Sequence, residues 1–580
     1  MLRTHNIFLS LLALLPFLCF GQQNIVFTHP DLPDLLQGNY SVEDYQDENA
    51  LQELESILDD LPAKVSTDSL QAYLRQLSDF ENRNTGSDTL SSTFGIGAAR
   101  QWIHEKMETF APERLIVSYL QFDQNICDMG RHKNVVAVLP GIGAQKHEVV
   151  LVEGHMDSRC EDPCGINCEA QGAEDNGSGT VLVMELARVM SRYAFNRTIV
   201  FMTTTGEEQG LFGANAFAEY CEQAEVKLMG VFNNDTVGGI ICGATASLPG
   251  CPGLNAIDSI NVRIYSQGGT GSIHKGLARY LKLEYEENIA PRLAVRSEIN
   301  LMTPEDRIGR GGDHIPFRQR GFAAIRMTSA HEHGNGNPST PDYDDRQHTS
   351  SDRIGVDTDG DGEIDQFFVD FNYLRRNAII NANAMIALAN APSAPQGLTL
   401  TRGENFIALA IEDEQDALAY RVGLRFSGSN DFDSLYTFDT KLDTIRGLPT
   451  DIYSFSVCSV DENGIESLFT KEQRLVFTTN TDELSYDSQQ IELLQNHPNP
   501  FDEATIIGVV VQEKIPSGNA SIVVHNLEGK VITKLPIQLK LGVNEVVYDY
   551  QYHNYTPGTY AYSLVIDGQY FATKQMIYAY

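Results

Sequence analysis

Short apolar runs alternate with longer helical patterns along this chain up to about residue 390. The strand-length runs lie at 114–122, 133–141, 148–154, 198–204, 227–235, 260–266 and 322–328. Helical spacing begins near residue 64 and recurs at 179–193, 211–221, 272–282 and 372–390. Strands that are apolar throughout are buried on both faces, which is typical of parallel strands covered by helices. The pattern therefore predicts an α/β domain over 64–392 with a mainly parallel mixed sheet and helices on both faces.

The composition changes at residues 391–397, where APSAPQG indicates a linker. Beyond it the chain shows only short strand-like runs separated by turn residues, which predicts two all-β sandwich domains, over 393–480 and 486–580. Residues 22–63 are acidic and weakly periodic, and we expect them to form a leader or propeptide.

The first 21 residues have the pattern of a secretory signal peptide. Arg3 precedes an apolar run, and the small residues Cys19 and Gly21 stand at positions −3 and −1 of a cut before Gln22. The later sequence offers no apolar run of membrane-spanning length. We therefore expect an exported protein without a transmembrane segment.

Acidic residues number 78 against 42 basic residues, which gives a formal charge of −36. Such a charge repels phosphate backbones, so a nucleic-acid partner is not expected. Eight cysteines remain after Cys19, and an exported protein can keep disulfides. Cys242 and Cys251 form a plausible pair, and Cys458 is expected to be a buried thiol. The pairing within the cluster of Cys160, Cys164 and Cys168 stays open.

Imidazole and carboxylate side chains follow the ends of the predicted strands or open the next helix. The candidates are His155, Asp157, Asp175, Glu207, Glu208, Asp235 and His348. Each alone has an ordinary explanation, such as a helix cap or a solvated turn. Together they converge, because the carboxyl ends of parallel strands meet at one edge of a sheet.

Two histidines and three carboxylates suit zinc, and five ligands serve two ions only if one ligand is shared. Asp175 is the natural bridge, and Asp157 can hold the ring of His155. Glu207 and Glu208 repel each other unless a cation lies between them, so one can bind metal while the other handles protons. The sequence therefore predicts a two-metal hydrolytic site.

The segments GHMDS, AEDNGSGT, TGEEQGLFGA, NND and HTSSD occur in this order, and over about 64–392 the chain resembles the secreted bacterial di-zinc aminopeptidases. The resemblance implies one zinc on His155, Asp175 and Asp235 and a second on Asp175, Glu208 and His348. It also implies that Glu207 is the general base and that peptides with a free N-terminus are the substrates. Gln347 departs from the pattern, because relatives often carry an aromatic residue before the last histidine.

Two other functions stay open. The first is glutaminyl-peptide cyclisation, which uses the same fold with typically one zinc, and the second is a catalytically inactive cell-surface binding protein. Asp313 and His314, within GGDHIPF, match a further stretch of the family but have no assigned role.

Two C-terminal segments resemble known modules. Residues 448–467 resemble part of a fibronectin type III module, although the usual buried tryptophan is absent. Asn499-Pro500-Phe501, the turn at Gly558-Thr559-Tyr560 and the closing Lys574-Gln575-Met576 resemble the C-terminal sorting domain of the type IX secretion pathway. That resemblance implies the type IX machinery as a partner and a secreted or outer-membrane surface location.

An acidic loop at 357–365 resembles part of a calcium-binding loop. The candidate ligands of one structural Ca²⁺ are Asp357, Asp359, Asp361, Glu363 and Asp365. Gly362 occupies the sixth position, but the twelfth is Phe368 and not an acid. The ordinary alternative is a solvated acidic turn.

Overall fold

The computed structural model describes residues 22–243, 248–307, 310–331, 346–403, 405–415, 417–426, 428–449, 451–477, 491–512, 519–526, 530–549, 556–566 and 568–579. The expected signal peptide at 1–21 and the first residues of the expected sorting domain, 486–490, lie outside these ranges.

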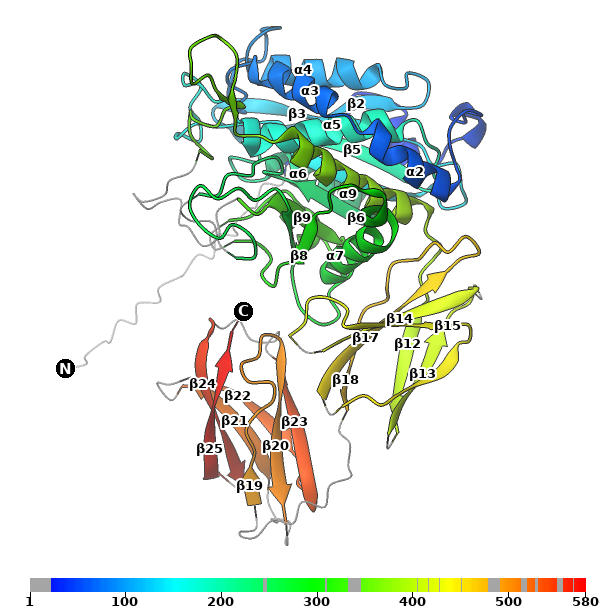
Figure 1. The fold of residues 1–580 in the computed structure, drawn as a ribbon, viewed down its shortest axis with the longest axis vertical. Helices are drawn as coiled ribbons and strands as arrows, with labels where there is room; N and C mark the ends of the chain where they lie inside the picture. Colours follow the sequence, from blue (N-terminus) through cyan, green and yellow to red (C-terminus); the bar gives the residue numbers. More distant parts are fainter. Residues whose placement is uncertain are drawn as a thin grey trace, which may run out of the picture.

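A nine-stranded mixed sheet forms the centre of the large domain, in the order β1-β2-β3-β5-β4-β6-β9-β7-β8 (Figure 1). Its strands are β1 (Gln23–Phe27), β2 (Ile116–Ile126), β3 (Met129–Leu139), β4 (Glu148–His155), β5 (Thr198–Thr204), β6 (Lys227–Asn234), β7 (Asn261–Tyr265), β8 (Glu298–Leu301) and β9 (Ala324–Ser329). The central strands β5, β4, β6 and β9 are parallel, and β7 and β8 are parallel to each other. β1, β2 and β3 pair antiparallel, as do β3 with β5 and β9 with β7. The predicted mixed sheet is confirmed, with its parallel part concentrated at the centre.

Helices cover both faces of this sheet, as predicted. They are α1 (Leu32–Leu36), α2 (Leu54–Lys64), α3 (Thr67–Ser78), α4 (Gly95–Glu108), α5 (Gly179–Met190), α6 (Phe212–Gln223), α7 (Ile273–Glu284), α8 (His314–Gln319) and α9 (Phe371–Asn390). Successive strand residues point to opposite faces: Val135 and Ala137 join the core under α3, α4, α5, α7 and α9, whereas Val136 and Val138 join the core under α1, α6 and α8. Capping fixes helix starts, for example where Asp370 accepts a hydrogen bond from the backbone N–H of Tyr373.

Residues 22–63, expected as a leader or propeptide, are packed into the large domain and are not a separate leader; removal of the segment as a propeptide stays a prediction. β1 pairs with β2 at the edge of the sheet. Leu32, Leu35 and Leu36 of α1 are buried in one core, and Ile57 of α2 is buried in the other. β1 and α1 have five residues each, which is too short to show a repeat, whereas α2 is an eleven-residue helix that the prediction missed.

Three disulfides hold the loops of this domain. Cys242 pairs with Cys251 as predicted. Cys160 pairs with Cys168, and Cys164 pairs with Cys127, which the sequence left open. Cys458 is a buried free thiol, which confirms the prediction, and so is Cys221.

Two β-sandwiches follow the α/β domain. The first packs the sheet β12-β13-β16 (Gly397–Arg402, Phe406–Glu412, Leu442–Arg446) on the sheet β15-β14-β17-β18 (Ser434–Phe438, Ala419–Phe426, Asp451–Val460, Gln473–Phe477). The second packs β19-β20-β23 (Ile491–Leu493, Ala504–Val511, Gly542–Asp549) on β22-β21-β24-β25 (Val531–Ile537, Ala520–Asn526, Gly558–Ile566, Gln569–Tyr578). The predicted all-β regions are therefore present after the α/β domain.

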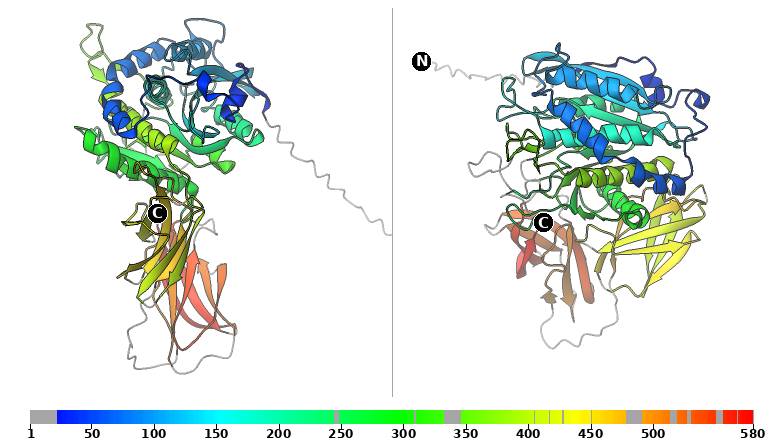
Figure 2. Two further views of the ribbon diagram at one scale, coloured as in Figure 1. Left: turned by 90° about the vertical axis from the view of Figure 1, so that its right-hand side faces the viewer. Right: turned by 45° about the horizontal axis from the view of Figure 1, so that its top comes forward.

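The sandwiches lie on the α7 side of the large domain (Figures 1 and 2). Arg421 on β14 forms an ion pair with Glu287 near the end of α7, and Tyr280 of α7 donates a hydrogen bond to the carbonyl of Glu466. Thr270 reaches the second sandwich by donating to Glu503. None of the helices among the described residues combines the length and apolar character that a membrane span requires.

Candidate metal centre

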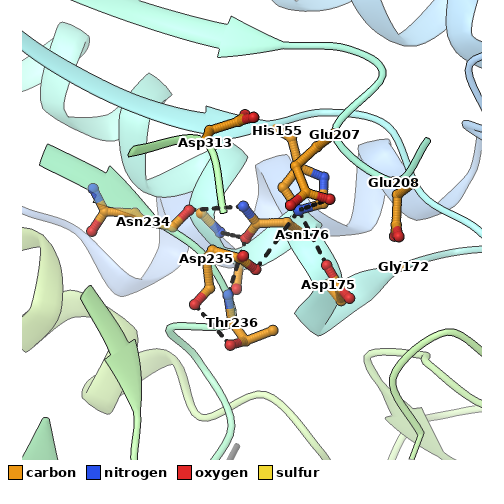
Figure 3. A network of polar contacts seen from close by, with 12 residues as sticks. His155, Gly172, Asp175, Asn176, Glu207, Glu208, Asn234, Asp235, Thr236 and Asp313 are labelled. Atoms are coloured by element: carbon orange, nitrogen blue, oxygen red, sulfur yellow. Dashed lines mark hydrogen bonds and ion pairs between the residues drawn. The ribbon is translucent and has the colours of Figure 1, made fainter. Parts of the chain in front are cut away.

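The central parallel strands deliver their carboxylate and imidazole groups to one edge of the sheet (Figure 3). His155 is the last residue of β4, and Asp235 directly follows β6. Glu207 and Glu208 lie in the turn after β5. Asp175 lies in the irregular turn Ala173–Ser178 that leads into α5. Because neighbouring parallel strands end at one level, side chains more than fifty residues apart in sequence meet here.

The ligand candidates form two sets that share Asp175. On one side, His155 Nε2 lies 3.2 Å from Asp175 Oδ1 and 3.7 Å from Asp235 Oδ1. On the other, His348 Nε2 lies 3.0 Å from Asp175 Oδ2 and 3.3 Å from Glu208 Oε2. Each oxygen of Asp175 thus faces a different histidine, as a bridging carboxylate requires. The structure brings all five predicted ligands together.

Glu207 lies beside the first set, with its Oε2 3.9 Å from His155 Nε2. Ligand atoms of His155, Glu207 and Asp235 come within 4.8 Å of one another, and so do those of His155, Asp175 and Glu208. Glu207 is therefore close enough to act on a molecule held between the two sets.

Asp157 contacts His155, as predicted, and also holds a neighbouring turn. The ring nitrogen Nδ1 of His155 lies 3.1 Å from the backbone carbonyl of Asp157 but 3.6 Å from its carboxylate. The buried carboxylate instead accepts hydrogen bonds from the backbone N–H groups of Glu207 (3.4 Å) and Glu208 (3.3 Å) and from the hydroxyl of Thr85 (3.1 Å). Asp157 thus fixes His155 by its main chain and the Glu207–Glu208 turn by its side chain.

Three further side chains hold the ligands, and none was singled out by the sequence as doing so. Gln347 Nε2 donates to Asp175 Oδ2 over 2.7 Å. Asp352 accepts from the backbone N–H groups of Glu174 and Asp175, each over 2.9 Å. Arg326, buried on β9, donates to Asp235 Oδ2 over 2.9 Å and to both oxygens of Asp306. The only sequence signal was the unusual glutamine before His348.

Electrostatics at this edge favour a cation. Burial raises the pKa of Glu207 and Glu208 well above the ordinary value, and neighbouring carboxylates add to the shift. Burial opposes the protonation of His155, but the surrounding carboxylates, Glu207 first, outweigh it and raise its pKa. Burial likewise raises the pKa of Asp175, yet hydrogen bonds with His155 and His348 lower it well below the ordinary value.

Three buried atoms of the two sets, His155 Nε2, Glu208 Oε1 and Asp235 Oδ1, have no hydrogen-bond partner. Buried polar atoms without a partner are costly, and a metal ion satisfies them. Imidazole nitrogens and carboxylate oxygens are the donors that zinc accepts in proteins. The residues present therefore fit a pair of zinc ions that share Asp175.

Asp313 lies near this centre, next to His155 and Glu207 in Figure 3. It is buried at the start of α8 and accepts a hydrogen bond from the hydroxyl of Thr204. Burial raises its pKa to about 7. His314, also buried, has its pKa lowered to about 4 by burial. Neither Asp313 nor His314 is among the grouped ligand atoms.

The acidic loop at 357–365 gathers three of its five candidate calcium ligands. Oxygens of Asp357, Asp359 and Asp361 lie within 4.8 Å of one another, all exposed. Asp365 turns instead to Thr358, accepting from its N–H and its hydroxyl. Glu363 is not part of the group. The loop connects the short strands β10 (Gly355–Val356) and β11 (Gln366–Phe367), so it is a hairpin turn and calcium stays a prediction.

Comparison with known proteins shows what the chain is similar to. Residues 134–371 match the model of peptidase family M28. A protein of Pyrenophora tritici-repentis named "Probable zinc metalloprotease" is 30% identical over 368 residues, which cover 60% of this chain and 80% of that protein. A similarly named protein of Leptosphaeria maculans is 31% identical over 352 residues, which cover 58% of this chain and 77% of that protein. The solved structure of the LapA aminopeptidase of Legionella pneumophila is 18% identical, covers 60% of this chain and 77% of its own, and has a TM-score of 0.42.

Proposed function

This chain belongs to peptidase family M28 and is a zinc metalloprotease, and on that premise we propose that it is an aminopeptidase that removes N-terminal residues from peptides. The observation that carries the proposal is the shared position of Asp175 between two sets of ligands, with Glu207 beside them. His155, Asp175 and Asp235 would hold one zinc ion, and Asp175, Glu208 and His348 the other.

Bound zinc would polarise the scissile carbonyl and lower the pKa of the attacking water. Within this frame Glu207 is the general base: it takes a proton from water and later gives it to the departing amine. Burial raises the pKa of Glu207, and cations beside it would lower that pKa again. Asp157 holds the backbone of Glu207 in place, which sets the direction of its carboxylate.

The base assignment is tested by Glu207→Gln, which keeps the size of the side chain and removes its basicity. We expect the variant to retain its zinc, measured by elemental analysis, and to lose nearly all release of p-nitroaniline from leucine p-nitroanilide. Asp68→Asn, on the exposed face of α3, is the matched control and should remain active. A Glu207→Gln enzyme with full turnover would remove this residue from the mechanism.

Exopeptidase action is tested with pairs of peptides that differ only in an N-terminal acetyl group. An aminopeptidase releases the first residue from the free peptide and not from the acetylated one. Internal cleavage of acetylated peptides would contradict the proposal while leaving the zinc metalloprotease intact. Cyclisation of N-terminal glutamine, without release of leucine and with one zinc per chain, would favour the glutaminyl-peptide cyclotransferase.

We also propose that the chain is a bacterial protein exported through its signal peptide and the type IX pathway, to the medium or the outer-membrane surface. Three disulfides support an oxidising compartment. The Asn499-Pro500-Phe501 segment folds against the last strand, because the backbone of Phe501 bonds to Ile577 and Ala579. Deletion of 486–580 should leave the protein inside the producing cell, as measured by fractionation.

The first sandwich is proposed to be a fibronectin type III-like module, and the acidic hairpin a structural calcium site. The paired sheets β12-β13-β16 and β15-β14-β17-β18 support the first proposal. The grouping of Asp357, Asp359 and Asp361 supports the second. Calorimetric titration with Ca²⁺ of the full chain and of Asp359→Asn tests the calcium site, and no heat of binding in either protein would end it.

A further inference from the structure

A hollow of about 600 Å³ lies where α4 covers β2 and β3 (Figure 1), and none of its lining residues is a ligand candidate. Its charged lining consists of Arg100 from α4, Arg131 and Lys133 from β3, and Asp123 from β2. Three cations thus accompany one carboxylate, in a chain whose formal charge is −36. The lining of the hollow is therefore opposite in sign to the chain as a whole.

A helix and a strand hold these cations together. Arg131 and Lys133 are two residues apart on β3, so they point to the same side of the sheet. Val135 continues that side and packs in the core under α4. Arg100 lines the hollow from α4 itself. The positions of the three cations are therefore fixed by regular secondary structure.

The single carboxylate is already used by one of the cations. Arg131 Nε donates to Asp123 Oδ1 over 2.7 Å, and its Nη2 donates to Oδ2 over 3.2 Å. Among the described residues, the guanidinium group of Arg100 has neither a hydrogen bond nor an ion pair. Lys133 Nζ lies 4.9 Å from the ring centre of Tyr119, and within the same part of the chain it has no ion pair. Arg100 and Lys133 therefore keep hydrogen-bond donors for a ligand.

The three cations also repel one another. Burial lowers the pKa of Lys133, and the positive charges of Arg100 and Arg131 lower it further. Burial likewise lowers the pKa of Arg100. Like charges that are held at fixed positions disfavour the charged state, and a bound anion removes that repulsion.

The carboxylates further along α4 do not neutralise the hollow. Glu108 and Glu105 oppose the effect of burial, which lowers the pKa of His104. Neither of them contributes to the pKa shifts of Arg100 and Lys133. The positive charge at the hollow is therefore left to a ligand.

We propose that this hollow, which we call the Arg100 site, binds an oxyanion, with Arg100 and Lys133 as the donors. Guanidinium groups bind carboxylate and phosphate through paired N–H bonds, and an ammonium group adds a point charge. A hollow lined by one sign of charge also attracts ions of the opposite sign. The inference goes beyond the proposed peptidase function, because it concerns a second site.

The oxyanion has two sources, free phosphate and the carboxylates of an acidic peptide. The second source is close to the proposed substrate site. Asn134, next to Lys133, accepts a hydrogen bond from the backbone N–H of Thr205 over 3.2 Å, and Thr205 stands two residues before Glu207. The Arg100 site therefore lies beside the edge of the sheet that carries the metal centre.

Isothermal titration calorimetry of the full chain tests both sources at low salt. The probes are inorganic phosphate, acetyl-Glu-Glu-Glu amide and, as its neutral counterpart, acetyl-Gln-Gln-Gln amide. The acetyl group removes the free N-terminus that the metal centre is proposed to hold. Zinc can also bind phosphate, so the binding assigned to the hollow is the part that the variants remove.

Arg100→Gln and Lys133→Gln should each weaken this binding about tenfold or more, because a hydrogen bond to a charged group contributes about that much. The double variant should abolish it. Arg75→Gln, which removes an exposed arginine of α3 outside the hollow, is the matched control and should bind as the native chain does.

Gly130 offers a second test that leaves both donors in place. It lines the hollow, and a Cβ atom at this position meets nothing within 4 Å, so a longer side chain fits without displacing a neighbour. Gly130→Glu places a carboxylate in the hollow and should abolish binding of the anion. Gly130→Gln has the same size without the charge and should still bind it.

The probe that binds identifies the source, and binding of both phosphate and the acidic peptide supports the shared chemistry. Binding of neither probe would overturn the Arg100 site. Affinities that stay unchanged in the double variant and in Gly130→Glu would overturn it as well. None of these measurements depends on turnover, so a chain without aminopeptidase activity would refute the proposed function and leave the Arg100 site to its own test.

Discussion

Replacing Asp175 by asparagine separates the two halves of the metal centre. Asp175 presents Oδ1 to His155 and Oδ2 to His348, so an asparagine of the same shape retains one oxygen and places an NH₂ group where the other stood. An amide nitrogen of this kind donates hydrogen bonds and does not bind a metal.

The neighbours decide which half is lost. Gln347 Nε2 donates to Asp175 Oδ2 over 2.7 Å, and two NH₂ groups would repel each other at that position. The asparagine oxygen is therefore expected to face Gln347 and His348, with its NH₂ toward His155. The His155 set loses one of three ligands, whereas the His348 set keeps all of its own.

Loss of a neighbour that merely supports a ligand weakens metal binding about 10- to 100-fold. Loss of a ligand should exceed this, so we expect more than about 100-fold weaker binding at the His155 set, or at least about 2.7 kcal/mol. Elemental analysis after dialysis should show zinc falling from two ions per chain to one, with Asp68→Asn unchanged. Retention of both ions would refute the bridging role, and loss of both would refute the orientation set by Gln347.

Three further perturbations test the surroundings of the site. Arg326→Met leaves Asp235 and Asp306 without their buried guanidinium partner, so the free energy of unfolding in urea should fall by about 3–5 kcal/mol. Arg131→Met, at an exposed pair, should leave the free energy of unfolding nearly unchanged, because solvent screens exposed ion pairs. The Cys242→Ser/Cys251→Ser variant removes a disulfide that closes a loop with a sequence separation of 9. Calorimetric melting should show that the free energy of unfolding falls by about 2–3 kcal/mol. An unchanged melting curve would contradict a stabilising role of this disulfide. Burial raises the folded-state pKa of Glu284 from 4.5 to about 8. The stabilising contribution of this group is therefore complete below about pH 4.5 and disappears as the pH rises to about 8. Glu284→Gln should remove this part of the pH dependence of unfolding, and an identical profile in the variant would exclude the assignment.

Apolar strands that are buried on both faces were the most predictable part of the fold. β4 and β5 are fully buried along their length, and each contains a continuous apolar run, over 149–152 and 199–202. β1 and β8 were missed, because they are short and their burial alternates. α4 begins with GIGAAR, whose small residues pack closely but give little apolar periodicity.

The candidate ligands could be predicted because the end of an apolar run in the sequence marks the end of a buried strand, and the polar residues that follow it are visible there. Their supports could not, since each is a contact between distant segments. Gln347 reaches Asp175 across 172 positions, and Asp352 reaches the backbone of the same residue across 177. Arg326 is a charged residue inside a buried strand, and its ion pairs with Asp235 and Asp306 account for its position there.

The residues that hold the ligands in place also affect how tightly a metal ion binds. Arg326 engages Asp235 Oδ2 and leaves Oδ1 to the His155 set, and Asp157 fixes the backbone of Glu207 and Glu208. The ligands are thus restrained before an ion arrives, so less conformational freedom is lost when it binds. The same restraint keeps four carboxylates close together when the ion is removed, which destabilises the metal-free protein. Chelation should therefore lower the melting temperature of the native enzyme more than that of Asp175→Asn, in which one of those charges is already gone.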